Sequence, residues 1–234
     1  MGDNDIPAEE AIAPPTKVSA RRIGLIGDDH NAVADGSTLP AEVLEAFAGV
    51  DLIIHLGHMG VREQLGRGVL DRLGAIAPVL AIRDYTANEA GEMFVTPADG
   101  DRVAGLTRVI DADGTRIGAV HNLSQPPGPA ITTPPGGLPE LAGVDVAKTV
   151  GEKFGGPVDV VAFGSSHRPA VAFAGGVIFV NPGSPTYGKG PGRIPGQTPL
   201  GTVGILDLDG KAATFEIIEL ACLRDAAAKE HAPA

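Results

Sequence analysis

The stretch Ile23-Gly-Leu-Ile-Gly-Asp-Asp-His-Asn31 decides the fold. Its apolar part, 23–26, is a strand without polar alternation, which is typical of a sheet that is buried on both faces. Asp28, Asp29 and His30 follow directly after it. Groups at the carboxyl end of such a strand lie at the edge of an open α/β sheet where binding sites form. The stretch therefore predicts an α/β fold with a functional site around residues 28–30.

Outward from this strand, helices and further strands alternate along the chain. Strands are expected at 51–56 and 79–82, with amphipathic helices at 40–47 and 62–73. After Thr86 the pattern changes. We expect a hairpin of 103–110 and 115–120, a helix at 140–154, and later strands at 158–163, 171–173, 177–180, 203–208 and 213–218. The second half of the chain is therefore β-rich.

Two ends and one internal segment depart from this pattern. Residues 1–20 mix acids, alanine and proline without apolar periodicity and predict a disordered N-terminal tail. Residues 21–221 are expected to form one domain, followed by a C-terminal tail at 222–234 that begins as a frayed helix. Residues 122–139 contain six prolines, which lack a backbone donor, and predict a long surface loop.

Composition excludes several classes of function. The 234 residues carry 18 Lys and Arg against 29 Asp and Glu, a net charge of −11, and 43% of them are hydrophobic, as expected of one domain. No apolar run is long enough to span a membrane, and the negative charge disfavours nucleic acid. Cys222 is the only cysteine, which excludes an intramolecular disulfide and suits the cytoplasm. We expect a cytoplasmic protein without membrane or nucleic-acid partners, and a homodimer formed through an edge strand stays open.

Most of the histidines follow predicted strands. Five of the six lie at or near strand ends: His30, His55, His58, His121 and His167. Asp84 and Tyr85 follow the strand at 79–82 in the same way. Such a convergence of ionisable groups on one sheet edge favours a functional site over isolated structural roles. His55 lies within its strand and is expected to belong to the core or to support the site from behind.

The order of short motifs resembles that of the calcineurin-like metallophosphoesterases, in particular their YfcE-like and Vps29-like branch. That family has D-x-H, G-D, G-N-x-D, H-G-H, G-H-x-H and N-P-G-S in this order. Here they are matched in whole or part by Asp28-Asp-His30, by His121, by Gly164-Ser-Ser-His167 and by Asn181-Pro-Gly-Ser184. The resemblance covers Arg22 to about Leu220 and implies a four-layer αββα sandwich, with two β layers inside and helices outside.

Several positions depart from the family's two-metal site. His58 stands where the family has the aspartate that bridges both metals, and Asp84-Tyr-Thr-Ala87 replaces G-N-x-D. Leu123 and Ser165 replace two further histidine ligands. The resemblance therefore implies a dismantled dinuclear site. One divalent zinc, manganese or iron ion held by Asp28, His30, His58 and His167 remains an alternative, as does a cluster of histidines that only hydrogen-bond one another.

The substitutions also add acids, and these lead to our first hypothesis. Asp29 and Asp84 join Asp28 at the expected cleft, and two opposed carboxyl groups are enough to hydrolyse a glycosidic bond without metal. We therefore expect a metal-independent hydrolase, without cofactor, that acts on an oligosaccharide or another polar small molecule. Its catalytic residues would be Asp28, Asp29, His30, Asp84, His121 and His167. Its substrate-binding residues would be His58, Arg83, Tyr85, Ser165, Arg168 and Tyr187.

Two other hypotheses stay open. The first alternative is a metal-dependent phosphoesterase with one metal, which the retained ligands favour. The cations near the same edge would suit its phosphate group: Arg83, Arg168, Lys189 and Arg193. The second is a non-catalytic interaction scaffold like the Vps29-like members of the family, and it predicts an exposed apolar patch for a partner.

Overall fold

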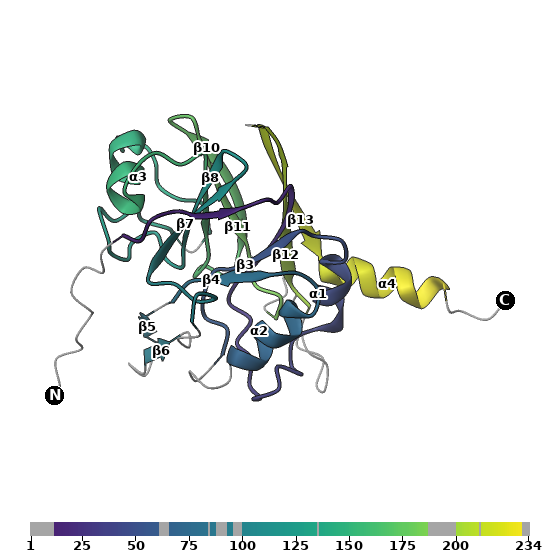
Figure 1. The fold of residues 1–234 in the computed structure, drawn as a ribbon. Coiled ribbons are helices and arrows are strands. Elements are labelled where there is room, and N and C mark those ends of the chain that lie inside the picture. Colours follow the sequence, from purple (N-terminus) through teal and green to yellow (C-terminus); the bar gives the residue numbers. More distant parts are fainter. Residues whose placement is uncertain are drawn as a thin grey trace.

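Two β-sheets packed face to face form the centre of the molecule (Figure 1). The computed structural model describes residues 12–60, 66–83, 85–87, 93–95, 100–134, 136–186, 200–210 and 212–230. The first sheet has six strands in the order β1 (Thr16–Val18), β7 (Thr107–Ala112), β8 (Thr115–Val120), β9 (Val160–Phe163), β11 (Val177–Pro182) and β10 (Pro169–Ala174). The second has five, in the order β13 (Ala212–Glu219), β12 (Thr202–Asp209), β2 (Arg22–Ile26), β3 (Leu52–His55) and β4 (Val79–Ala81).

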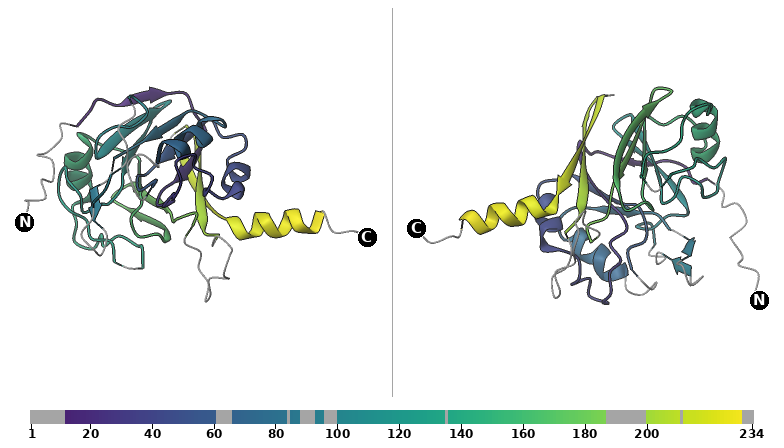
Figure 2. Two further views of the ribbon diagram at one scale, coloured as in Figure 1. Left: turned by 90° about the horizontal axis from the view of Figure 1, so that it is seen from below. Right: turned by 180° about the vertical axis from the view of Figure 1, so that it is seen from behind.

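Helices cover the outer faces of the two sheets. Helices α1 (Ala41–Ala46) and α2 (Gly66–Gly74) share a buried apolar cluster with the five-stranded sheet, and α3 (Val146–Phe154) shares another with the six-stranded sheet. A third cluster fills the space between the sheets. This confirms the predicted four-layer αββα sandwich. Helix α4 (Leu220–Glu230) extends away from the sheets toward the C-terminus (Figure 2). None of the helices in the described ranges is long and apolar enough to cross a membrane.

Parallel pairing brings the site loops together. Strands β2, β3 and β4 are parallel, with Ile26 opposite His55, so the turns after β2 and β3 are neighbours. In the other sheet β8 and β9 are parallel, with Val120 opposite Phe163. The turns after these two strands are therefore neighbours as well. Four loops that carry the ionisable residues leave the two sheets at their carboxyl edges.

The prediction that residues 1–20 form a disordered tail is wrong for residues 16–18. Residues 16–18 form strand β1, which pairs in parallel with residues 110–112 of β7, and Arg108 Nε donates to Thr16 Oγ1 over 3.2 Å. A strand of three residues is too short to show periodicity, so the sequence pattern had no signal for it. Residues 1–11 lie outside the described residues, and the other domain limits stay predictions.

Three further elements differ from expectation. Helix α3 begins at Val146, six residues later than 140, because Asp145 accepts the Lys148 backbone N–H and so caps the first turn. Strands β5 (Tyr85–Ala87) and β6 (Met93–Val95) form a small separate sheet that the sequence did not predict. The described part of 122–139 contains neither helix nor strand, as expected of a proline-rich loop.

Candidate functional site

Five ionisable side chains from both sheets meet at the shared edge. Asp28 and His30 follow β2, His58 follows β3, His121 follows β8, and His167 lies between β9 and β10. His30 Nε2 lies 3.1 Å from His167 Nε2. Asp28 Oδ1 lies 3.4 Å from His167 Nε2, 3.6 Å from His58 Nδ1 and 3.8 Å from His121 Nε2. The structure thus brings together the histidines that the strand ends carry.

The backbone at this edge is unusual. Among the described residues, positive φ occurs at six positions other than glycine. Five of them belong to the site: Asp28 (57°), His30 (51°), His58 (55°), Ser165 (70°) and His167 (56°). Side chains with a Cβ rarely adopt this left-handed conformation, and such strain gathers where function requires a particular geometry. The backbone therefore marks the same residues as the side-chain chemistry does.

Asp28 lies at the centre of the cluster and is completely buried. Burial alone would raise its pKa, but His121 and then His167 and His58 hold the pKa of the carboxyl group well below its ordinary range. Asp28 Oδ2 accepts the Ser165 backbone N–H over 2.8 Å. Asp28 Oδ1 makes no hydrogen bond with the described residues, although it faces three imidazole rings. A buried carboxylate oxygen in this position is well placed for a cation.

The histidines are neutral or oriented in ways that suit metal ligands. Burial and the neighbouring His58 lower the pKa of His30 to about 3, which keeps its imidazole neutral near pH 7. His121 Nδ1 donates to the Leu56 carbonyl oxygen over 2.7 Å, because a carbonyl can only accept. Nε2, the other ring nitrogen of His121, then lies 3.8 Å from Asp28 Oδ1. A backbone carbonyl orients metal-binding histidines in the same way in many proteins.

The donor set fits one metal ion. One ligand atom each from Asp28, His30, His58 and His167 lies within 4.8 Å of all the others. In a tetrahedral site with bonds of about 2.0–2.1 Å, neighbouring ligand atoms are about 3.3–3.4 Å apart. The measured separations of 3.1, 3.4 and 3.6 Å are close to that value. Three imidazoles and one carboxylate suit zinc, iron or manganese.

The described residues form no second group of this kind. Leu123, at the position of a family histidine, is buried in the apolar cluster under α3. Ser165, at the position of another, accepts a hydrogen bond from Asn122 Nδ2 over 3.2 Å. Gly164, just before it, lies so close to Asp28 that an added Cβ would come within 3.1 Å of Asp28 Oδ2. Small residues thus surround the carboxylate on this side.

Asp29 does not join the cluster. It is 1% exposed, and its Oδ2 accepts a hydrogen bond from His55 Nε2 over 2.8 Å. His55 Nδ1 accepts the Gly57 backbone N–H, so its proton lies on Nε2. Asp29 Oδ1 accepts the Asn31 backbone N–H, and burial raises the pKa of Asp29. Contrary to expectation, the Asp29 carboxylate is directed toward His55 and not toward the cluster. His55 is fully buried, as expected of a residue of the core or one that supports the site.

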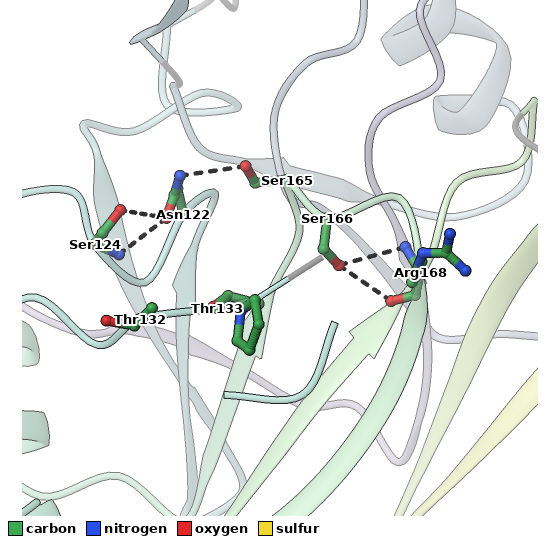
Figure 3. Close-up of a pocket in the computed structure, with 8 residues that line it drawn as sticks. Asn122, Ser124, Thr132, Thr133, Ser165, Ser166 and Arg168 are labelled. Carbon is green, nitrogen blue, oxygen red and sulfur yellow. Dashed lines mark hydrogen bonds between the residues drawn. The ribbon is translucent and has the colours of Figure 1, made fainter. Parts of the chain in front are cut away.

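Other candidate residues lie beside the cluster or outside the described residues. Ser165 and Arg168 line a cavity of about 560 Å³ next to the cluster (Figure 3). Arg83 is half-buried, and its backbone N–H donates to Gly105. The structure gives the backbone of Tyr85, in β5. The remaining candidates lie outside the described residues: Asp84, Tyr187, Lys189 and Arg193.

The Asn181-Pro-Gly-Ser184 turn supports the site from behind. Ser184 Oγ donates to the Asp28 carbonyl oxygen over 2.6 Å, and Thr186 Oγ1 donates to that of Asp29 over 3.0 Å. Asn181 Nδ2 donates to the Gly164 carbonyl oxygen over 3.0 Å. The sequence identified this turn as a motif without assigning it this supporting role.

Comparison with known proteins defines the class. Residues 22–211 match the calcineurin-like phosphoesterase superfamily domain, and the chain belongs to this family. It is 26% identical over 197 residues to a probable metallophosphoesterase of Methanothermobacter thermautotrophicus, which covers 84% of this chain and 91% of the relative. It is 27% identical over 172 residues to a probable metallophosphoesterase of Methanocaldococcus jannaschii, which covers 72% and 70%. A single mutant of Vps29 from Entamoeba histolytica has a similar fold, with a TM-score of 0.51, 18% identity, and 85% and 98% of the two chains covered.

These findings overturn the leading hypothesis of glycosidic hydrolysis. The family and both curated relatives are phosphoesterases by description. The geometry removes one of the proposed carboxylates, since Asp29 is bound to His55, and Asp84, the acid expected to oppose Asp28 or Asp29, lies outside the described residues. The sequence shows how many acidic residues follow these strands, but not the direction in which each side chain points. The expectation of a hydrolase holds at the level of the phosphoesterase family, and that family uses divalent metals.

Proposed function

We propose that this protein is a phosphoester hydrolase that works with one divalent metal ion held by Asp28, His30, His58 and His167. The observation that carries this function is the convergence of these four donors within 4.8 Å, around a buried carboxylate oxygen that lacks a hydrogen bond with the described residues. When bound, the ion supplies a Lewis acid that polarises the phosphoryl group and makes water acidic enough to attack near neutral pH.

The chain's own residues prepare the donors. The Ser165 backbone N–H fixes one oxygen of Asp28, and Ser184 holds the Asp28 backbone from behind. His121 faces Asp28 Oδ1 from the opposite sheet and is oriented by the Leu56 carbonyl. Donors that are held in place before the substrate binds need no rearrangement during the reaction. In hydrolysis a water oxygen bonds to phosphorus, the bond to the alcohol oxygen breaks, and that oxygen takes up a proton.

Metal removal and reloading test this function. The protein is stripped with a chelator and then loaded with zinc, manganese or iron in turn. Metal content, and hydrolysis of p-nitrophenyl phosphate and bis(p-nitrophenyl) phosphate, are measured at each stage. We expect one bound ion per chain, turnover only in a loaded form, and loss of both in His167→Gln, with the fold checked by circular dichroism. A protein that keeps no metal and turns over neither ester would contradict the proposal.

A non-catalytic scaffold is the second candidate function. Strand β10 lies at the edge of the six-stranded sheet, and two of its side chains on one face are exposed: Val171 (48%) and Phe173 (72%). Apolar side chains at an open sheet edge are typical of interaction surfaces. Retention of metal without turnover of any phosphoester would favour this candidate.

A further inference from the structure

A polar cavity adjoins the metal-ligand cluster. Its volume is about 560 Å³, and it lies between the loop after β8 and the turn from β9 to β10 (Figure 3). Five hydroxyl groups line it, from Ser124, Thr132, Thr133, Ser165 and Ser166. Asn122, Pro134 and Arg168 complete the lining. Neither Arg168 nor any of these hydroxyls takes part in the proposed metal site.

The residues that line the cavity are neighbours of the cluster residues along the chain. Asn122 follows His121 directly, and Ser166 and Arg168 lie on either side of His167. The Ser165 backbone N–H donates to Asp28 Oδ2 over 2.8 Å, which joins the two sites directly. This proximity is what a substrate would need to place its phosphoryl group at the cluster and the rest of the molecule in the cavity.

Hydrogen bonds hold part of the lining in place. Asn122 Nδ2 donates to Ser165 Oγ over 3.2 Å, and Ser124 Oγ donates to Asn122 Oδ1 over 2.7 Å. Ser166 Oγ accepts from the Arg168 backbone N–H over 3.3 Å. The lining is thus organised before a ligand binds.

The buried Lys153 side chain fixes the loop that forms one wall. Its Nζ donates to the Gln125 carbonyl oxygen over 2.6 Å and to the Pro127 carbonyl oxygen over 3.0 Å. Its side chain reaches this loop from the last turn of α3 and is completely buried. The wall formed by residues 132–134 is therefore part of a loop that is attached to the body of the domain.

The chemistry of the lining selects the ligand. Among the described residues that line the cavity, none is aromatic and Pro134 is the one apolar residue, so these residues offer no stacking surface for a nucleobase or an aryl group. Hydroxyl and amide groups match a ligand with several hydroxyl groups. Arg168 is the only charged residue in the described part of the lining, and a guanidinium group favours carboxylate and phosphate partners.

We infer that this cavity binds the alcohol part of the substrate: a small hydroxylated alcohol that carries a second anionic group, held by Arg168. The inference rests on the proposed phosphoesterase function. Hydrolysis would release this alcohol from the cavity and leave inorganic phosphate at the cluster.

Three probes that share a phosphomonoester group test the cavity. Phenyl phosphate has an aryl group, glycerol 3-phosphate has hydroxyl groups, and 3-phosphoglycerate has a hydroxyl group and a carboxylate. With the metal-loaded protein we expect kcat/KM to rise in this order, with about tenfold between the last two. Arg168→Met should reduce the ratio between the last two about tenfold. The matched control is Arg21→Met, an exposed arginine at the amino end of β2, and it should leave the ratio unchanged.

Equilibrium binding separates this inference from the proposed function. The same three probes are titrated by calorimetry into metal-loaded protein and into both variants. Turnover with equal kcat/KM for all three, or a ratio that Arg168→Met does not change, overturns the cavity inference and leaves the phosphoesterase intact. Absence of turnover, with tight binding of 3-phosphoglycerate that Arg168→Met weakens, contradicts the phosphoesterase and supports the cavity. No binding of 3-phosphoglycerate at millimolar concentration overturns the cavity inference.

Discussion

Asp28 and Asp29 are consecutive residues in one turn, both are buried, and their surroundings have opposite effects. Three imidazole rings lie within 4 Å of Asp28, and its pKa is held far below the ordinary value. Asp29 has one imidazole partner, His55, and burial raises its pKa. Equal burial therefore does not decide the direction in which the pKa of a carboxyl group shifts. The direction depends on whether its neighbours stabilise the anion by more than burial destabilises it.

The two carboxylates also face different parts of the molecule. Asp28 faces the edge where the loops meet, whereas Asp29 faces the interior and joins the turn to β3 through His55. The first is placed to hold a cation and the second holds the backbone of its neighbours. The comparison predicts that changes at Asp28 affect metal binding and that changes at Asp29 affect stability.

The largest expected effect is that of Asp28→Asn. Loss of the only carboxylate among the four proposed ligands should lower activity by roughly 1,000-fold or more, and metal affinity with it. Metal content after dialysis and kcat/KM are the measurements. The matched control is Asp209→Asn at the exposed end of β12, and equal metal content in both variants would break the comparison.

Asp29→Ala should mainly reduce stability. It leaves the His55 Nε2–H and the Asn31 N–H without their acceptor, and removal of one partner from a buried pair costs about 3 kcal/mol. Urea unfolding of the metal-free protein measures this loss. Metal affinity of the folded variant should fall far less than in Asp28→Asn. A drop in metal affinity as large as that of Asp28→Asn, with unchanged stability, would reverse the assignment of the two residues.

Gly164→Ala tests how strictly metal binding depends on the position of the Asp28 carboxylate. The new methyl group would come within 3.1 Å of Asp28 Oδ2 and must displace the carboxylate slightly. Overpacking of this kind costs about 1–3 kcal/mol, which corresponds to about 5- to 150-fold in metal affinity if the donors carry the displacement. Calorimetric titration with zinc measures it. Unchanged affinity together with lower stability would show that the backbone moves instead of the donors.

Lys153 extends the comparison to a buried cation whose described partners are carbonyl oxygens only. Burial lowers the pKa of Lys153 from its ordinary 10.5 to about 8. Between these two values the unfolded chain binds more protons than the folded one, so this group's contribution to stability rises as the pH rises through that window. Below about pH 8 the unfavourable contribution is constant.

In Lys153→Met this contribution to the pH dependence of stability is absent, because methionine does not titrate. The difference in the free energy of unfolding, wild type minus variant, should increase by about 1 kcal/mol between about pH 8 and about pH 9.5. Urea titrations at several pH values give the difference directly. A flat difference would mean that the two carbonyl partners keep the ammonium group charged throughout.

Much of the architecture could be predicted from the sequence. Strands β2, β3 and β4 are continuous apolar runs, and such runs identify a buried parallel sheet. The positions of His30, His58 and His167 after strands then place them at one edge, where the structure has them. Strand β1 could not be predicted, because three residues show no periodicity and its partner β7 is about ninety residues away.

The direction of individual side chains could not be predicted. Asp28 and Asp29 have the same chemistry, and although the family motif places only Asp28 among the possible metal ligands, no pattern in the sequence showed that Asp29 is directed toward His55. The separation depends on the positive φ of Asp28 and on a buried histidine in the next strand. The cavity likewise depends on how a proline-rich loop folds back toward Arg168, and no periodic pattern encodes that path.

The five site residues in the left-handed conformation have a consequence for laboratory evolution. Each holds a backbone geometry that costs about 1 kcal/mol for a residue with a Cβ and nothing for glycine. A library selected for heat resistance alone should therefore enrich glycine at positions 28, 30, 58, 165 and 167, and lose metal binding as it does so. A library selected for turnover should keep the present residues and improve elsewhere. Sequencing both populations would show at which positions stability and activity compete.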